Sequence, residues 1–201
     1  MSETTIDRAL ASFKLHHGWL RTGQALELGI APRTLYALRD SGLIIRENRG
    51  LFRLTDAPPP AYPDLIQVSL KISKGIICLI SVLAFHGVTT QIPHQVYLAL
   101  PNDAEKPRLD FPPLRLFWLS EKSYSVGVEE RIIEGIPVKM YSIEKTIADC
   151  FKFRKKIGAD IAIEALTQCI RDGRCHLSTL VEYAQVNRVE KIIQPYLEIL
   201  V

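Results

Sequence analysis

The spacing of apolar residues predicts a series of short helices at the start of the chain. Ile6, Leu10 and Phe13 recur at helical spacing, and this stripe predicts a helix over residues 4–17. A helix with a single apolar stripe buries that stripe against a neighbour. We therefore expect this helix to pack behind the two helices that follow it in the sequence.

Two more short helices are predicted, joined by a tight turn. Thr22 can cap the first of them, and Gly29 ends it. Residues 30–32 form the turn, and its proline suits a first helical position, because the N–H that proline lacks would be unpaired there. The second helix then runs from residue 33 to residue 41 and stops at Gly42.

The helix over residues 33–41 has an apolar side and a polar, basic side. Leu35 and Leu38 share the apolar side with Ile30 from the turn. The other side carries the residues that we expect to point outward, with Arg39 at its edge: Arg33, Thr34, Tyr36 and Ala37. A short helix, a turn and a second helix with outward basic residues is the geometry that enters the major groove of DNA.

A β-hairpin is predicted after this helix. Residues 43–47 and 51–54 are β-prone, and Asn48-Arg49-Gly50 forms a turn between them. A hairpin in this place, with Arg49 at its tip, is typical of the wing of a winged helix-turn-helix. We therefore predict a winged helix-turn-helix DNA-binding domain over residues 1–56.

The positive charge of the chain is concentrated in the same stretch. Residues 31–53 contain five arginines and two acidic residues, a net charge of +3, which equals that of the whole chain. This favours a local contact with DNA over general coating of nucleic acid. Two alternatives stay open. The stretch could be an unrelated helical subdomain with arginines on its solvent-exposed face, or a helix-turn-helix that is used only for protein contacts. The residues predicted to bind DNA are Arg33, Thr34, Tyr36, Ala37, Arg39, Arg46, Arg49 and Arg53.

A proline-rich segment marks a predicted domain boundary. Four prolines between residues 56 and 63 are incompatible with a continued helix or a central strand. Such a segment forms a stiff, extended spacer, so residues 57–63 are predicted to be a linker. A proline-rich ligand for a partner domain is the alternative. Residues 64–201 then form a second domain, whose 17 basic and 16 acidic residues leave it without a comparable basic footprint.

The second domain is predicted to be a mixed α+β domain, with a small central sheet flanked by helices. Ser142 should cap the helix that follows it. The expected helices cover residues 64–74, 76–86, 143–156, 161–171, 178–185 and 190–200. The expected strands cover residues 96–100, 114–119, 128–134 and 137–141. The fold class of the whole chain is accordingly α+β.

The second domain shows no motif for catalysis. A Gly-rich phosphate loop, G-x-S-x-G and H-E-x-x-H are all missing from the sequence. The acidic residues that invite comparison with a metal-dependent nuclease are spread over different loops and strands, away from the tight acid-x-lysine spacing of that chemistry: Asp103, Glu105, Asp110 and Glu134, with Lys139. We predict a protein that is not an enzyme, with no catalytic residue, no metal ion and no cofactor.

The cysteines and the apolar runs indicate the cellular location of the protein. Cys78, Cys150, Cys169 and Cys175 form no C-x-x-C motif, and five residues separate the closest pair. This favours buried free thiols in a reducing cytoplasm over a metal site. The N-terminus has no signal-peptide pattern, and the apolar run over residues 76–85 is about half the length needed to span a bilayer. We expect a cytoplasmic protein with no membrane contact.

Several stretches, taken in order, are similar to the motifs of a known family. In the first domain they are residues 28–30, 35–38, 41–44 and 49–54, the last of which is similar to the family's wing ending, R-G-V-Y-R-L. In the second domain they are residues 81–87 and 138–149, the latter similar to the family segment V-Y-S-x-E-R-T-x-A-D. Lys145 stands where the family usually has arginine, and Leu51-Phe52 replaces Val-Tyr. On these residues the chain resembles the AbiEi antitoxins, the transcriptional-regulator half of type IV toxin–antitoxin modules.

The resemblance implies a function that the residues alone do not. It implies a sequence-specific repressor that binds double-stranded DNA at its own promoter, with inverted repeats expected there. It also implies an antitoxin that counters a nucleotidyltransferase-like toxin encoded next to it. Two alternatives stay open: a nuclease or transferase that the winged helix delivers to DNA, and a repressor that responds to a small ligand in the second domain. A neighbouring nucleotidyltransferase gene would favour the antitoxin, and a convergent acidic cluster would favour the enzyme.

Overall fold

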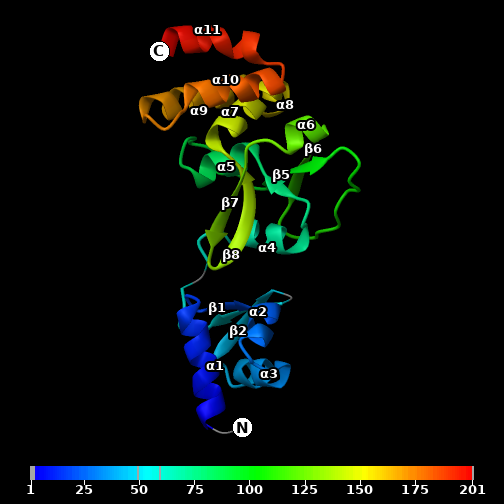
Figure 1. The fold of residues 1–201 in the computed structure, drawn as a ribbon, viewed down its shortest axis with the longest axis vertical. Helices are drawn as coiled ribbons and strands as arrows, with labels where there is room; N and C mark the ends of the chain where they lie inside the picture. Colours follow the sequence, from blue (N-terminus) through cyan, green and yellow to red (C-terminus); the bar gives the residue numbers. More distant parts are fainter. Residues whose placement is uncertain (1–2, 49, 59, 201) are drawn as a thin grey trace. The chain divides into compact units, whose positions relative to one another are not determined.

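The chain folds into helices and two separate β-sheets, so its fold class is α+β. A computed structural model describes residues 3–48, 50–58 and 60–200, and over these residues it contains a three-stranded and a five-stranded sheet (Figure 1). The chain forms two compact units, one built from residues up to Pro63 together with Ile132–Pro137, and the other from Asp64–Arg131 and the residues from Val138 onward. Each unit has its own cluster of buried apolar side chains.

The first unit combines helices with the three-stranded sheet. Its helices are α1 (Glu3–Leu15), α2 (Thr22–Glu27) and α3 (Pro32–Asp40). Its strands are β1 (Trp19–Arg21), β2 (Ile44–Asn48) and β3 (Leu51–Leu54), which pair antiparallel in the order β1-β3-β2. The three helices and the hairpin match the elements predicted from the sequence, whereas strand β1 was not predicted.

The core of the first unit lies between α1, α3 and the sheet. Phe13 on α1 and Leu38 on α3 are fully buried, and Leu35 is almost so. Ile6 and Leu10 are partly buried and pack against the same cluster. The predicted apolar stripe of α1 therefore does face the core.

Helix α2 begins differently from the prediction. Arg21, and not Thr22, occupies the N-cap position, and its backbone N–H donates to the Oε1 atom of Gln24 at 3.0 Å. The reason is that β1 extends through Arg21 to pair with Leu51, so Thr22 is already the first helical residue.

The second unit surrounds a mixed five-stranded sheet in the order β6-β5-β4-β8-β7. Its strands are β4 (Ile76–Ile77), β5 (Val96–Pro101), β6 (Leu114–Leu119), β7 (Val128–Ile133) and β8 (Ile136–Tyr141). Its helices are α4 (Pro63–Lys71), α5 (Leu79–Phe85), α6 (Glu121–Tyr124), α7 (Ile143–Lys152), α8 (Arg154–Ile157), α9 (Ala159–Arg171), α10 (Leu177–Val186) and α11 (Glu190–Leu200). Strand β4 pairs antiparallel with β5 and parallel with β8.

The predicted helix over residues 76–86 is wrong in its first part. Ile76 and Ile77 form the central strand of the sheet, and the helix begins only at Leu79, after the N-cap residue Cys78. Both the strand and the helix are buried, so the run is apolar on every side and its periodicity cannot distinguish the two. β-branched residues such as isoleucine fit a pleated strand well.

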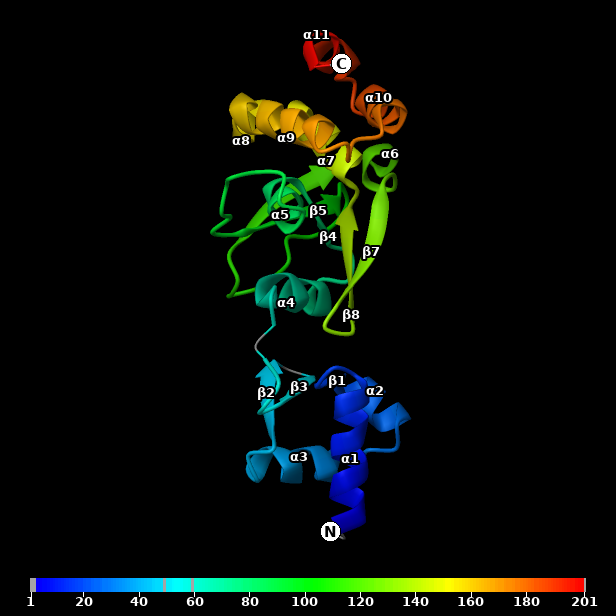
Figure 2. The ribbon, with the colours of Figure 1, turned by 90° about the vertical axis from the view of Figure 1, so that its left-hand side faces the viewer.

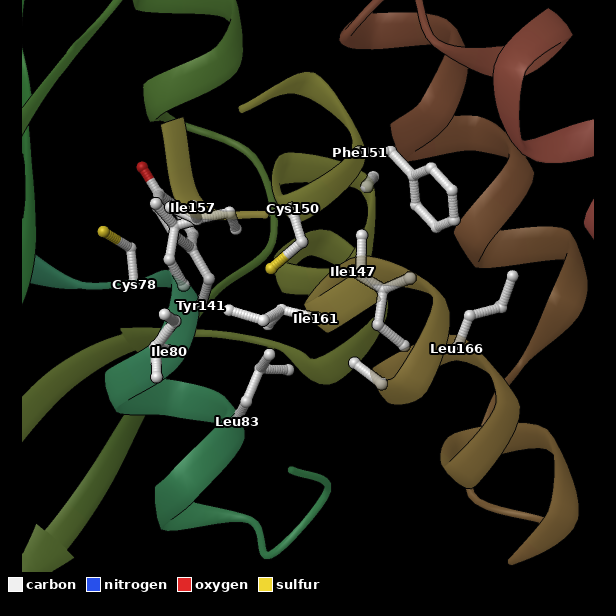
Figure 3. Packing of buried hydrophobic residues seen from close by; sticks show 14 of the residues in the cluster. Cys78, Ile80, Leu83, Tyr141, Ile147, Cys150, Phe151, Ile157, Ile161 and Leu166 are labelled. Carbon is white, nitrogen blue, oxygen red and sulfur yellow. The ribbon is translucent and has the colours of Figure 1, made fainter. Parts of the chain in front are cut away.

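Helix α7 is the centre of the second unit. It contacts α5, α8, α9, α10 and α11, and the C-terminal helices α8 to α11 lie together with it at one end of the sheet (Figures 1 and 2). As predicted, Ser142 caps it: the Ser142 Oγ atom accepts a hydrogen bond from the Lys145 backbone N–H at 3.2 Å. Apolar side chains from α7, such as Ile147, pack against others from α5 and α9 (Figure 3).

Candidate nucleic-acid interface

Helix α3 presents a basic and aromatic face to solvent. The turn before it is held by the Ile30 N–H, which donates to the Ala25 carbonyl oxygen at 2.8 Å. Pro32 is the first helical residue, as predicted. From this start, Arg33 and Tyr36 are exposed, and Tyr36 has 49% of its surface accessible. An exposed arginine and tyrosine in the first two turns of such a helix are suited to reach a DNA groove.

Thr34 does not point outward, which corrects the prediction. It is only 3% exposed. It lies one turn before Leu38 on the helix, so its side chain falls on the face that packs against the core. Ala37 is half-buried. Thr34 therefore cannot read bases in this conformation, although its polar hydroxyl favoured an outward position in the sequence.

Arg39 is engaged with its neighbours on the helix. Its Nε and Nη2 atoms donate to the Asp40 Oδ1 atom at 2.9 and 2.7 Å. Its Cζ atom lies 5.1 Å from the centre of the Tyr36 ring, within the range of a cation–π contact. The charge of Arg39 is thus partly balanced, and its position at the edge of the outward face helps to orient the tyrosine.

The predicted wing is the hairpin of β2 and β3, which carries a bulge between Arg46 and Asn48. Arg49, predicted at its tip, lies outside the described residues. Arg53 differs from the prediction, because its side chain is only 11% exposed and its Nε atom donates to the Glu47 Oε1 atom at 2.6 Å. It also donates to the carbonyl oxygens of Leu54 and Ala57. Arg53 therefore stabilises the hairpin, and its side chain is not exposed for contact with a ligand.

A groove beside α3 contains a basic residue that the sequence reasoning missed. The groove has a volume of about 610 Å³ and is lined by α1, by the turn before α3 and by the start of α3. Arg8 and Arg33 both line it, with the hydroxyl-bearing residues Thr5 and Ser12. Arg8 and Ser12 lie one turn apart, on the side of α1 away from the buried Phe13, and this polar spacing could have indicated a second basic contact.

The pairing of charges changes the distribution predicted from the sequence. Both acidic residues of the 31–53 stretch are in ion pairs, Asp40 with Arg39 and Glu47 with Arg53. Arg8 and Arg33, which line the groove, are not among the arginines in these two ion pairs.

A comparison with protein-family models identifies this part of the chain. Residues 7–55 match the model described as "Transcriptional regulator, AbiEi antitoxin". The matched residues lie within the first unit. The match covers α1 through β3, the elements that carry Arg8, Arg33 and Tyr36. A search of curated proteins found no match.

The fold of the chain is also similar to that of a solved structure. The crystal structure of the RV2827C protein from Mycobacterium tuberculosis matches with a TM-score of 0.54 and 11% sequence identity. The alignment covers 98% of this chain and 82% of the other. At this identity the likeness concerns the fold alone.

Outside the matched residues, the second unit contains a buried ion pair that was not predicted from the sequence. Lys145 and Asp149 are 0% and 1% exposed, and the Lys145 Nζ atom lies 2.6 Å from both carboxylate oxygens. The Asn187 Nδ2 atom donates to the same carboxylate at 2.7 Å, and Lys145 also lies 4.3 Å from the centre of the Tyr141 ring. The spacing of four residues on a helix was a signal that could have predicted this pair.

The pair belongs to a larger polar cluster at the C-terminal end of α10, where Asn187 is the C-cap residue. Asn187 accepts a hydrogen bond from the Ser123 hydroxyl at 2.8 Å and one from the Lys152 Nζ atom at 3.2 Å. Burial raises the pKa of Asp149, while the charge of Lys145 and the hydrogen bonds from Lys145 and Asn187 oppose the rise. The polar groups of the cluster form hydrogen bonds with one another, and these bonds join α6 and α7 to the end of α10.

Within the described ranges, no group of three or more histidine, cysteine or acidic residues is placed to hold a metal ion. In the same part of the chain, no helix is long and apolar enough to cross a membrane.

Proposed function

We propose that this protein is a sequence-specific DNA-binding repressor whose first unit acts as a winged helix-turn-helix. The observation that carries the proposal is the exposed pair Arg33 and Tyr36 on α3, next to a groove that Arg8 shares. Helices α2 and α3 with the β2–β3 hairpin are compatible with this motif. The match of residues 7–55 to transcriptional regulators of the AbiEi family supports it.

Different residues are proposed for base and backbone contacts. Arg33 is proposed to read base edges in the major groove, because an arginine can donate two hydrogen bonds to guanine, and Tyr36 is proposed to flank it. Arg8, Arg46 and Arg49 are proposed to contact phosphates, which fixes the protein on the duplex without reading sequence. Arg46 and Arg49 would do so from the wing.

Arg33→Ala is expected to weaken binding to the operator by about 1–3 kcal/mol, while binding to unrelated DNA weakens less. The reason is that the variant loses a base contact as well as a charge. A gel-shift assay on the protein's own promoter, compared with scrambled DNA of equal length, measures both.

Arg131→Ala is the matched control, because Arg131 lies in the second unit and forms an exposed ion pair with Glu129. It removes the same charge from the chain and should leave operator binding unchanged. Equal operator affinity of wild type and Arg33→Ala would show that Arg33 is not a recognition residue.

We further propose that the protein represses its own operon and counters a nucleotidyltransferase-like toxin encoded beside it. The description of the matched family as an antitoxin supports this role, as does the resemblance of residues 138–149 to a family motif. In the structure these residues form strand β8, the Ser142 cap and the first part of α7. The toxin-directed activity is proposed to reside in the second unit, over residues 64–201.

A full-length variant should separate the two activities. Arg8→Ala combined with Arg33→Ala is expected to abolish promoter repression while cells that express the toxin still survive, because both residues lie in the first unit. Promoter activity and survival are scored in the same strain, with the toxin on a separate inducible promoter. Loss of rescue together with repression would show that the activities are not divided between the units.

A further inference from the structure

Positive charge gathers where helix α7 meets helix α8. Residues 150–159 contain four basic residues and no acidic one, although residues 64–201 as a whole are nearly balanced in charge. Lys155 and Lys156 on α8 are exposed, whereas Lys152 at the end of α7 and Arg154 at the start of α8 are half-buried. Among the described residues, none of these four side chains forms an ion pair. Acidic side chains of the chain therefore do not neutralise this local charge.

A fifth cation reaches the same junction from the sheet. The Arg115 Nη2 atom on β6 donates to the Lys156 carbonyl oxygen at 2.5 Å. The Arg115 Cζ atom lies 5.4 Å from the centre of the Tyr97 ring and 6.0 Å from that of the Phe117 ring. In the part of the chain that the structure describes, Arg115 also has no carboxylate partner. The tertiary fold thus completes a basic cluster, which consists of Arg115, Lys152, Arg154, Lys155 and Lys156.

An aromatic ring lies among these cations. The Lys152 and Lys156 Nζ atoms lie 5.7 and 5.8 Å from the centre of the Phe153 ring, within the range of a cation–π contact. The ring packs against Phe117 in a T-shaped arrangement, with the ring centres 4.9 Å apart. Phe153 is half-buried, so part of its side chain is accessible beside the two lysines. Two like charges that share one ring repel each other, and a bound anion would relieve this repulsion.

We propose that the basic cluster and Phe153 form a binding site for single-stranded nucleic acid in the second unit. Cations without acidic partners attract a polyanion, and a nucleic-acid backbone offers regularly spaced phosphates. An accessible aromatic ring adds stacking with an unpaired base. The bases of a duplex are already paired and stacked inside the helix, and an acidic protein segment has no bases. The ring among the cations therefore favours a single strand over both.

This site is separate from the interface proposed on the first unit. That interface depends on Arg8, Arg33 and Tyr36 and is proposed to bind duplex DNA. The basic cluster belongs to the second unit, so this inference does not depend on operator binding. Single-stranded RNA and single-stranded DNA share the chemistry that the cluster recognises, and separate arms of the experiment distinguish them.

Binding of short labelled oligonucleotides to the full-length protein tests the proposal. The strands are oligouridylate, oligothymidylate and a duplex of equal length and unrelated sequence, and fluorescence anisotropy measures each affinity. Arg8→Ala combined with Arg33→Ala provides the background, because it removes the proposed contacts of the first unit. We expect this background variant to bind the single strands more tightly than the duplex. Tighter binding of the RNA or of the DNA strand shows which of them the site takes, and either result supports the proposal.

Variants of the cluster, made in the same background, separate charge from stacking. Lys155→Ala combined with Lys156→Ala should weaken single-strand binding about tenfold and reduce the salt slope by about 1.4, since each phosphate contact on a single strand contributes about 0.7. Phe153→Leu should weaken binding about fivefold or more with an unchanged salt slope. Lys71→Ala combined with Lys74→Ala is the matched control, because it removes two exposed charges elsewhere in the second unit.

The exposed lysines keep the test independent of folding. Lys155 and Lys156 lie at the surface, so their replacement should leave the thermal unfolding of the protein unchanged, which calorimetry checks. Equal single-strand affinity of this lysine variant and its matched control would overturn the proposal. So would a duplex that binds as tightly as the single strands, or displacement of oligothymidylate by polyglutamate as readily as by unlabelled oligothymidylate.

Discussion

Lys145→Met is expected to lower the free energy of unfolding of the second unit by about 3–5 kcal/mol, because breaking a buried ion pair leaves one charge without its partner. Asp149 would keep the hydrogen bond from Asn187 but lose the cation 2.6 Å from its two oxygens. Denaturant unfolding followed by circular dichroism measures the change. Such a loss is a large part of the stability of an ordinary domain.

Two controls test whether the loss of stability comes from the unpaired buried charge of Asp149. Arg131→Ala breaks an exposed pair with Glu129 and should change stability by no more than about 1 kcal/mol. Lys145→Met combined with Asp149→Leu removes both buried charges and should recover most of the stability. A double variant as unstable as the single one would show that the polar cluster, and not the unpaired charge, sets the effect.

The loss of unfolding free energy in Lys145→Met should depend on pH, and the pKa of Asp149 determines the direction. Without the lysine, burial raises the pKa of Asp149 with less opposition, further above its value in the unfolded chain. A carboxyl whose pKa rises on folding binds its proton more tightly in the folded state, and the stability that this provides is lost as pH rises through the folded pKa. The loss should therefore be smaller near pH 4, about the ordinary pKa of aspartate, than at neutral pH.

Phe13→Ala is expected to abolish operator binding by unfolding the first unit. Phe13 is fully buried in the core beneath α3, and truncation of such a side chain costs about 3–5 kcal/mol. A unit of about 60 residues has little stability to lose. Gel shifts with operator DNA and thermal unfolding of the full-length protein measure the two consequences.

The same helix provides the matched control for this variant. Leu15 is the last residue of α1 and is 82% exposed, so Leu15→Ala should leave both stability and operator binding unchanged. The unfolding transition of the second unit should be the same in both variants, since the two apolar clusters are separate. Full operator binding by Phe13→Ala would show that α1 does not support the DNA-binding face.

Local signals were enough to predict most helices and the strands that alternate with turns. The stripe through Phe13, the proline at the start of α3 and the cap at Ser142 depend on residues close in sequence, and the structure confirms each. Strands β1 and β4 depend on partners far along the chain. With three and two residues they are too short for a period of two to be visible.

The candidate site was predicted less well than the helices around it, because residue type does not determine direction. Thr34 is polar but lies one turn from Leu38 on the buried side. Arg53 is charged but its partner, Glu47, lies on the neighbouring strand, where only the hairpin register places it. Arg8 was overlooked for the opposite reason: it is on another helix, and only the tertiary fold brings it to the groove of Arg33.

The two-residue strand β4 is the only link between the two halves of the five-stranded sheet, as far as the described residues show. It separates β5 and β6 from β8 and β7, and its parallel register with β8 is set by the pair Ile77 and Met140, residues 63 positions apart. Each half is close to contiguous in sequence, whereas joining them closes a long loop, whose entropic cost grows with its length. Strands β7 and β8 are therefore expected to form as a local hairpin before they join β4. In a partly unfolded state, the pairing between β4 and β8 is expected to break before the other pairings of the sheet.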